Sequence, residues 1–89
     1  MTEQSALYML NDMIITLLER SEQAKESYRR AKETDADEGE IQYWLGVTLT
    51  YYMVLDTLIR QINTFGLVVD IPIASKVDPN KLLEDVLAM

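Results

Sequence analysis

Three glutamates in the first half of the chain have the residue type and spacing to hold a metal ion. Glu19, Glu22 and Glu26 recur three and four residues apart, so on a helix they share one face. Di-iron helical bundles combine inward-facing glutamates with Glu-x-x-His motifs. The sequence contains no histidine, and these glutamates fall opposite the apolar positions of the same helix. We therefore expect a solvated face with ion pairs, and no metal site.

Two aspartates, Asp12 and Asp56, are surrounded in the sequence by apolar residues. A carboxylate in a partly buried site is a candidate functional group, because burial perturbs its pKa. Asp56, however, precedes Arg60 by four residues, which is the spacing of an ion pair along a helix. The sequence favours the ion pair, and a functional carboxylate is the alternative.

Other arrangements that carry chemistry are missing from the sequence. It has no cysteine for thiol chemistry and no histidine to act as a general base near neutral pH. Its three glycines, Gly39, Gly46 and Gly66, are isolated, whereas phosphate-binding loops need clustered glycines between a strand and a helix. We therefore expect no catalytic residue, no cofactor and no enzymatic activity.

Aromatic side chains gather in the second half of the chain, where they could form a protein interface. Tyr43, Trp44, Tyr51 and Tyr52 are of the types that recur at interface hot spots. Helical spacing places Trp44 and Tyr51 in the core and directs Tyr43 and Tyr52 sideways. The predicted interaction surface comprises Tyr43, Leu45, Leu49, Tyr52, Met53 and Ile59.

Charge and hydropathy exclude two classes of partner. The net charge of −7 would repel nucleic-acid phosphates. The longest charge-free run, Ile41 to Leu55, contains polar residues and is shorter than the roughly 18–20 residues of a membrane span. The N-terminus lacks the basic region of a signal peptide. We expect neither nucleic-acid nor membrane binding, and a cytoplasmic location.

Two long helices must position these side chains. The first is predicted over about residues 3–33, where proline and glycine are absent and apolar residues recur three and four apart. The second is predicted over about 38–65, because Asp37 and Glu40 have capping-box spacing and Gly66 is a good stop. The expected core comprises Leu10, Ile14, Leu17, Ile41, Trp44, Tyr51, Leu55, Leu58 and Ile62.

The remainder of the chain is predicted to pack back on this hairpin. Residues 67–77 are β-branched and contain a proline, so we expect an extended segment anchored by Leu67, Val69 and Ile71. Asp78 followed by Pro79 is typical of a helix start, which predicts a short helix over about 79–88. The fold class is therefore all-α, with residues 1–89 forming one domain.

The second helix is apolar around more of its girth than one neighbour can cover. A helix with a single partner needs an apolar stripe of about 100°. We therefore expect a non-enzymatic interaction module that forms a homodimer, with two hairpins pairing into a four-helix bundle. The alternative is a small acidic chaperone, immunity or inhibitor protein that binds a heterologous partner. A further alternative is a small-ligand binder or enzyme, with a pocket that a dimer builds at its interface between Tyr43, Trp44, Tyr52 and Asp56.

Overall fold

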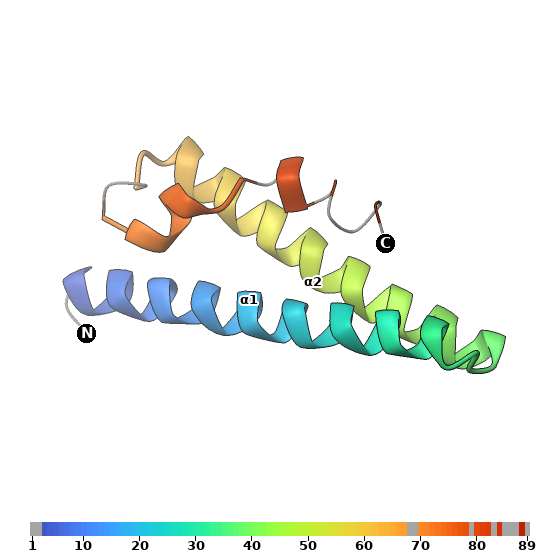
Figure 1. Cartoon of the computed structure of the whole chain (residues 1–89). Coiled ribbons are helices and arrows are strands. Elements are labelled where there is room, and N and C mark those ends of the chain that lie inside the picture. Colours follow the sequence, from blue (N-terminus) through green and yellow to red (C-terminus); the bar gives the residue numbers. More distant parts are fainter. Residues whose placement is uncertain (1–2, 68–69, 79, 83, 85–87, 89) are drawn as a thin grey trace.

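The computed structural model describes residues 3–67, 70–78, 80–82, 84 and 88. Two long helices, α1 (Glu3–Glu33) and α2 (Glu38–Thr64), run antiparallel and pack together. They lie close near the turn that joins them and diverge toward the N-terminal end of α1 (Figure 1). The described residues contain no strand. The predicted all-α fold, with two long helices packed together and a short C-terminal element, is confirmed.

The ends of α2 follow from local chemistry. The side chain of Asp37, in an extended conformation, accepts a hydrogen bond from the Glu40 amide at 2.9 Å, as predicted for the cap. At the other end Gly66 has φ 69°, which allows the Leu67 amide to donate to the Ile62 carbonyl at 2.9 Å. Glycine adopts this left-handed conformation without a steric penalty, so the helix stops there.

A tight turn joins the two helices. Asp35 adopts φ 55°, a conformation that aspartate tolerates better than most residues. The Ala36 amide then donates to the Ala31 carbonyl at 3.0 Å, and the Thr34 hydroxyl donates to the Arg30 carbonyl at 2.9 Å. The last carbonyls of α1 are thereby satisfied, and the chain reverses within four residues.

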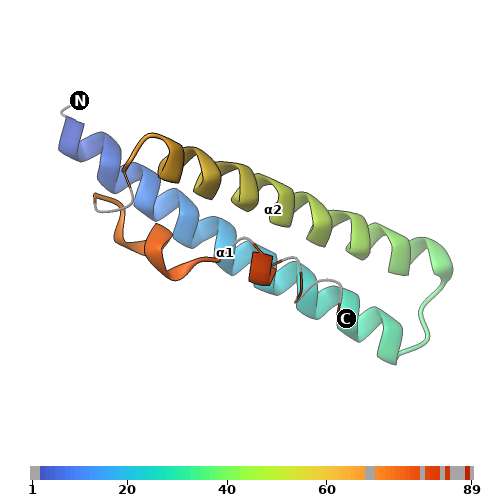
Figure 2. The same ribbon diagram turned by 90° about the horizontal axis from the view of Figure 1, so that it is seen from above.

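Residues 70–78, here called the strap, fold back over one side of the hairpin (Figures 1 and 2). They contain the 3-10 helix η1 (Pro72–Lys76), so the prediction of a wholly extended segment is wrong. Pro72 begins this turn because its fixed φ suits a helical start. The Ile73 amide donates to the Asn11 side-chain oxygen at 3.2 Å, which ties the strap to α1.

Beyond the strap, the structure describes only part of the predicted C-terminal helix. Residues 80–82 and 84 are helical, and the Asp78 side chain accepts a hydrogen bond from the Asn80 amide at 3.0 Å. Asp78 therefore caps this turn as expected. Pro79 and the predicted anchor Val69 lie outside the described residues.

The buried core lies where the strap meets both helices. It consists of Ile14, Leu55, Ile59, Ile62, Ile71 and Ala74. Among the predicted core residues, Leu10 and Leu17 pack against this cluster while partly buried. Four others are only half-buried: Ile41, Trp44, Tyr51 and Leu58. Toward the turn the buried side chains are small: Ser21, Ala24, Ala31 and Thr48.

The molecule is thin and exposes a large surface for its mass. Its extents are 48 × 25 × 15 Å, and its radius of gyration of 15.0 Å exceeds the roughly 12 Å of a compact chain this long. The accessible surface is 6049 Å², against about 5300 Å² for a typical monomer of this mass. The excess of about 700 Å² is close to the area that each partner buries in a standard interface.

Candidate interaction surface

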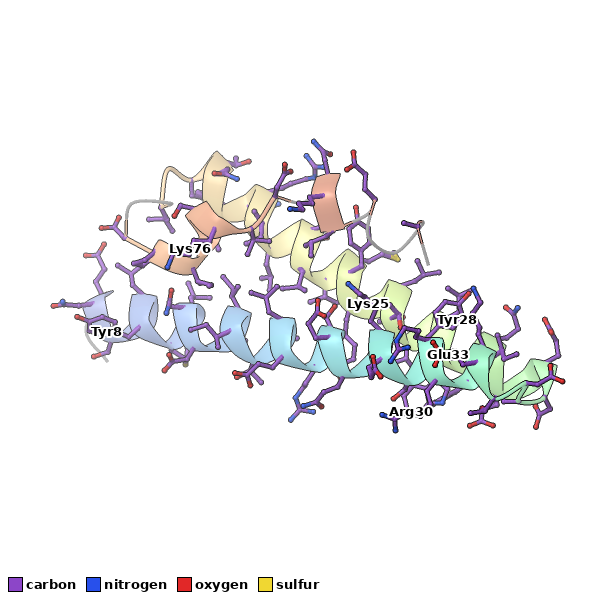
Figure 3. All side chains as sticks on the ribbon, in the orientation of Figure 1. Tyr8, Lys25, Tyr28, Arg30, Glu33 and Lys76 are labelled. Atoms are coloured by element: carbon purple, nitrogen blue, oxygen red, sulfur yellow. The ribbon has the colours of Figure 1, made fainter. Side chains whose placement is uncertain are left out.

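Of the three glutamates that could have bound a metal, Glu22 and Glu26 form ion pairs along α1, and Glu19 is exposed. Lys25 pairs with Glu22 at 3.6 Å, and Arg29 donates to both Glu26 and Glu33 (Figure 3 labels Lys25 and Glu33). The predicted solvated face with ion pairs is therefore present. No group of three or more acidic residues suited to a metal ion occurs within the described part of the chain.

The ion pairs of Glu22, Lys25, Glu26, Arg29 and Glu33 are here called the ion-pair ladder. Charge pairing shifts two pKa values in this ladder. Hydrogen bonding from Arg29 lowers the pKa of the Glu26 carboxyl below its ordinary value, because it stabilises the ionised form. The same contact raises the pKa of the Arg29 guanidinium. Both groups face solvent, so the ladder is a surface feature without the buried carboxylate that acid–base chemistry would use.

The two aspartates singled out by their apolar surroundings differ in their contacts. Asp56 accepts a hydrogen bond from Arg60 at 2.9 Å, which is the ion pair that the spacing predicts. Asp12 is exposed and makes no ion pair among the described residues. Asp12 lines an open strip on α1.

The structure does not bring the predicted interaction residues onto one surface. Tyr43 and Met53 are exposed, whereas Leu45, Leu49 and Tyr52 are half-buried. Tyr43 and Tyr52 stand nine positions apart, about two and a half turns, so they point to opposite sides of α2. The alternative pocket between Tyr43, Trp44, Tyr52 and Asp56 was expected at a dimer interface, so it stays a prediction.

Ile59 needs a correction. It was expected on the interaction surface, but its side chain is fully buried beside Ile71 and Ala74 in the core. Leu45, Tyr52 and Ile59 recur every seven residues along one line of α2. The strap covers the Ile59 end of that line. Leu45 and Tyr52 are therefore half-buried, whereas Ile59 is fully buried.

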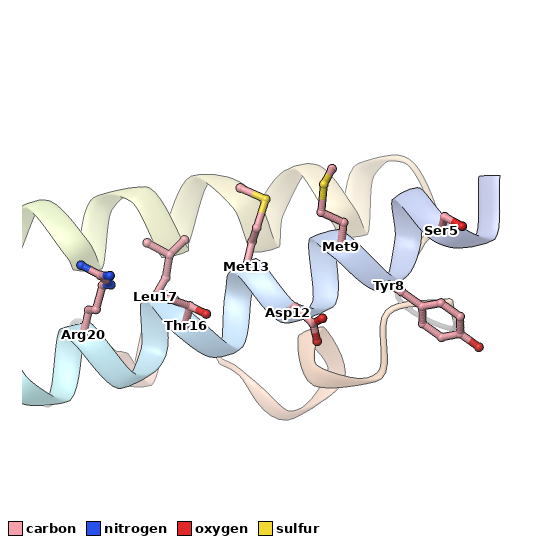
Figure 4. A pocket seen from close by; sticks show the side chains of 8 residues that line it. All are labelled: Ser5, Tyr8, Met9, Asp12, Met13, Thr16, Leu17 and Arg20. Carbon is pink, nitrogen blue, oxygen red and sulfur yellow. The ribbon is translucent and has the colours of Figure 1, made fainter. Parts of the chain in front are cut away.

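Large apolar side chains instead gather on the side of the hairpin away from the strap. On α1 these are Met9 and Met13, each 47% exposed, followed by the half-buried Leu17. Figure 4 shows all three projecting on the α2 side of α1, while the strap lies on the other side. They belong to a shallow strip, lined by α1 alone, that also contains Tyr8, Asp12, Thr16 and Arg20. A strip on one helix encloses nothing, so it is an open surface and not a ligand pocket.

On α2 the matching side chains are Val54, Leu58 and Phe65, of which Phe65 is 72% exposed. Spacings of four and seven residues place them on one line, and an apolar hollow lies beside Val54 and Leu58. We call Met9, Met13, Leu17, Val54, Leu58 and Phe65 the open face. From Tyr43 to Phe65 the only charged residues of α2 are Asp56 and Arg60, which pair with each other elsewhere on the helix.

A second hollow continues the uncharged side of α2 toward the turn. It lies over Gly46 and is flanked by Tyr43, Val47, Thr50 and Tyr51. A Cβ atom added to Gly46 would meet nothing within 4 Å. Mid-helix glycine costs up to about 1 kcal/mol relative to alanine, and no contact inside this chain requires it.

Sequence reasoning did not single out the open face. It assigned Leu17 and Leu58 to the core, where Leu17 does pack against the buried cluster, and it named Met9, Met13 and Phe65 neither as core nor as interaction residues. One signal was present: between Tyr43 and Phe65, the flank of α2 that carries Val47 and Val54 is free of charge. An uncharged flank facing water is unusual for a helix that has only one packed side.

Comparison with known proteins gives no family for this chain: no family model, curated protein or solved structure matches it. Within the described residues, neither long helix combines the length and hydropathy needed to cross a bilayer.

Proposed function

We propose that the protein is a non-enzymatic interaction module that self-associates through the open face, so that two hairpins form a four-helix bundle. The observation that carries this proposal is the set of large apolar side chains, from both helices, left uncovered on one side. Phe65 is 72% exposed and Met9 and Met13 are each 47% exposed. Burying such residues against a second copy removes apolar surface from water, which is favourable.

The size of the molecule supports the same proposal. Its surface exceeds that of a typical monomer by about 700 Å², and a standard interface buries about 800 Å² from each partner. The proposal includes a cytoplasmic location, which the absence of cysteine supports, because cysteine-free chains suit a reducing compartment.

The experiment that tests this proposal places a charge in the middle of the open face. Val54 is 41% exposed, so Val54→Glu leaves the hairpin folded. In a dimer the new carboxylate would be buried without a partner, which costs several kcal/mol. We expect the dimer, measured by light scattering during size exclusion, to weaken by roughly a hundredfold.

Asn63→Glu is the matched control, because residue 63 is exposed and lies nine positions from Val54, on the opposite side of α2. It should leave the mass unchanged. If the two variants behave alike, the open face is not the interface. A monomeric unmodified chain that binds a single different protein would favour the heterologous alternative.

A further inference from the structure

Two residues at the rim of the open face carry opposite charges and lack partners within the described chain. Asp12 and Arg20 are both exposed, and neither makes an ion pair, whereas Glu22, Glu26 and Glu33 of α1 are all paired. Both line the strip that contains Met9 and Met13 (Figure 4). They stand eight positions apart, about 12 Å along the helix axis, with Thr16 midway.

The spacing of Asp12 and Arg20 lets two copies of α1 match opposite charges only when the two helices run antiparallel. If α1 packs antiparallel on α1 of a second copy about a two-fold axis level with Thr16, Asp12 of each chain comes level with Arg20 of the other. Their Cα positions are then close enough for an arginine side chain to reach across. A parallel arrangement would set Asp12 against Asp12 and Arg20 against Arg20, which is repulsive on both counts.

The same axis also suits α2. Because the turn joins Glu33 to Glu38, Thr16 lies at the level of residues 54–55 on the antiparallel α2. A two-fold axis there places Val54 near its own copy and brings Tyr43 level with Phe65 of the second chain. These two aromatic side chains are 62% and 72% exposed, at opposite ends of the uncharged side. One axis therefore serves both helices.

We propose that a second copy of this chain docks antiparallel on the open face, about a two-fold axis level with Thr16, and that two symmetric Asp12–Arg20 ion pairs set its orientation. This inference rests on the proposed self-association and adds the direction and register. Glu19 is the remaining charge near this contact: it comes close to Asp12 of the other copy, and Arg20 offsets that repulsion.

Charge reversal provides the test, measured by sedimentation equilibrium at low salt. Asp12→Arg puts two arginines at each contact, and Arg20→Asp puts two aspartates there. Both residues are exposed and unpaired, so the fold is retained, as circular dichroism would verify. Each variant alone should form a dimer roughly tenfold weaker or more, because two favourable pairs become two repulsive ones.

The decisive sample is an equimolar mixture of the two variants. In the mixed dimer every contact again joins an arginine to an aspartate, so its affinity should return to that of the unmodified chain. The controls are Asp70→Arg and Lys76→Asp, exposed charge reversals on the strap (Figure 3 labels Lys76), which should have no effect.

The outcomes separate this inference from the proposed function. If the unmodified chain forms a dimer and the single variants match it, or if the mixture fails to restore affinity, the antiparallel register is wrong while self-association stands. If the unmodified chain is a monomer, the proposed function fails first. The proposed orientation is supported if each single variant dimerises weakly and the mixture regains the affinity of the unmodified chain.

Discussion

The two sides of the hairpin carry similar residues in very different surroundings. On one side Ile59 is fully buried, because Ile71 and Ala74 of the strap pack over it. On the other side Val54, five positions earlier on the same helix, is 41% exposed. The difference comes from what packs around each residue, since the core cluster around Ile59 includes Ile14 of α1 as well as the strap. Hydrophobicity alone therefore does not identify the core of this protein.

This comparison separates stability from association. Residues on the strap side stabilise the single chain, since their contacts are already made within it. The exposed side chains of the open face are Met9, Met13, Val54 and Phe65. Changing them should cost little folding free energy and should act on the proposed self-association. Substitutions on the strap side should therefore lower the free energy of unfolding, whereas substitutions on the open face should weaken self-association.

The largest effect on folding is expected on the strap side. Ile71→Ala removes a fully buried side chain from the core and leaves a cavity, which should cost about 2–4 kcal/mol of unfolding free energy. Ile15→Ala, at a position 37% exposed on α1, is the control and should cost much less. Urea denaturation checks both; equal losses would mean that the strap does not complete the core.

A smaller effect is expected at the tether between the strap and α1. Asn11→Ala removes the acceptor of the Ile73 amide and should cost about 1 kcal/mol. Asn11→Asp keeps an acceptor oxygen and serves as the control. Hydrogen exchange of the Ile73 amide should accelerate in the first variant only. Unchanged protection in both would show that the tether does not hold the strap.

The smallest effect is expected in the exposed ion-pair ladder, which belongs to neither side. Arg29 lowers the pKa of Glu26, so this contact contributes stability above the ordinary carboxyl pKa of about 4.5 and loses it as the pH falls through the lowered value. Arg29→Gln should return the pKa of Glu26 toward 4.5, measured by NMR titration. An unchanged titration would contradict the pairing.

Much of the fold was predictable from sequence because local chemistry determines it. Helices expected over 3–33 and 38–65 correspond to Glu3–Glu33 and Glu38–Thr64. An absence of glycine and proline, the Asp37 cap and the Gly66 stop each act within a few residues, so periodicity and cap chemistry suffice.

The open face was less predictable because it depends on a contact distant in sequence. Asn11 and Ile73 are 62 positions apart, and their hydrogen bond helps decide which side of the hairpin the strap covers. Periodicity shows that α2 is apolar around more of its girth than one neighbour can cover, but it does not show which part a later segment will cover. Ile59 was therefore assigned to the surface, and Leu58, which is half-buried, to the core.

Sedimentation equilibrium of the unmodified chain, over a range of micromolar concentrations, tests the central claim most directly. Self-association through the open face predicts a mass that rises with concentration toward twice the 10.2 kDa of one chain. A mass that stays at that of a single chain across the whole range would contradict it.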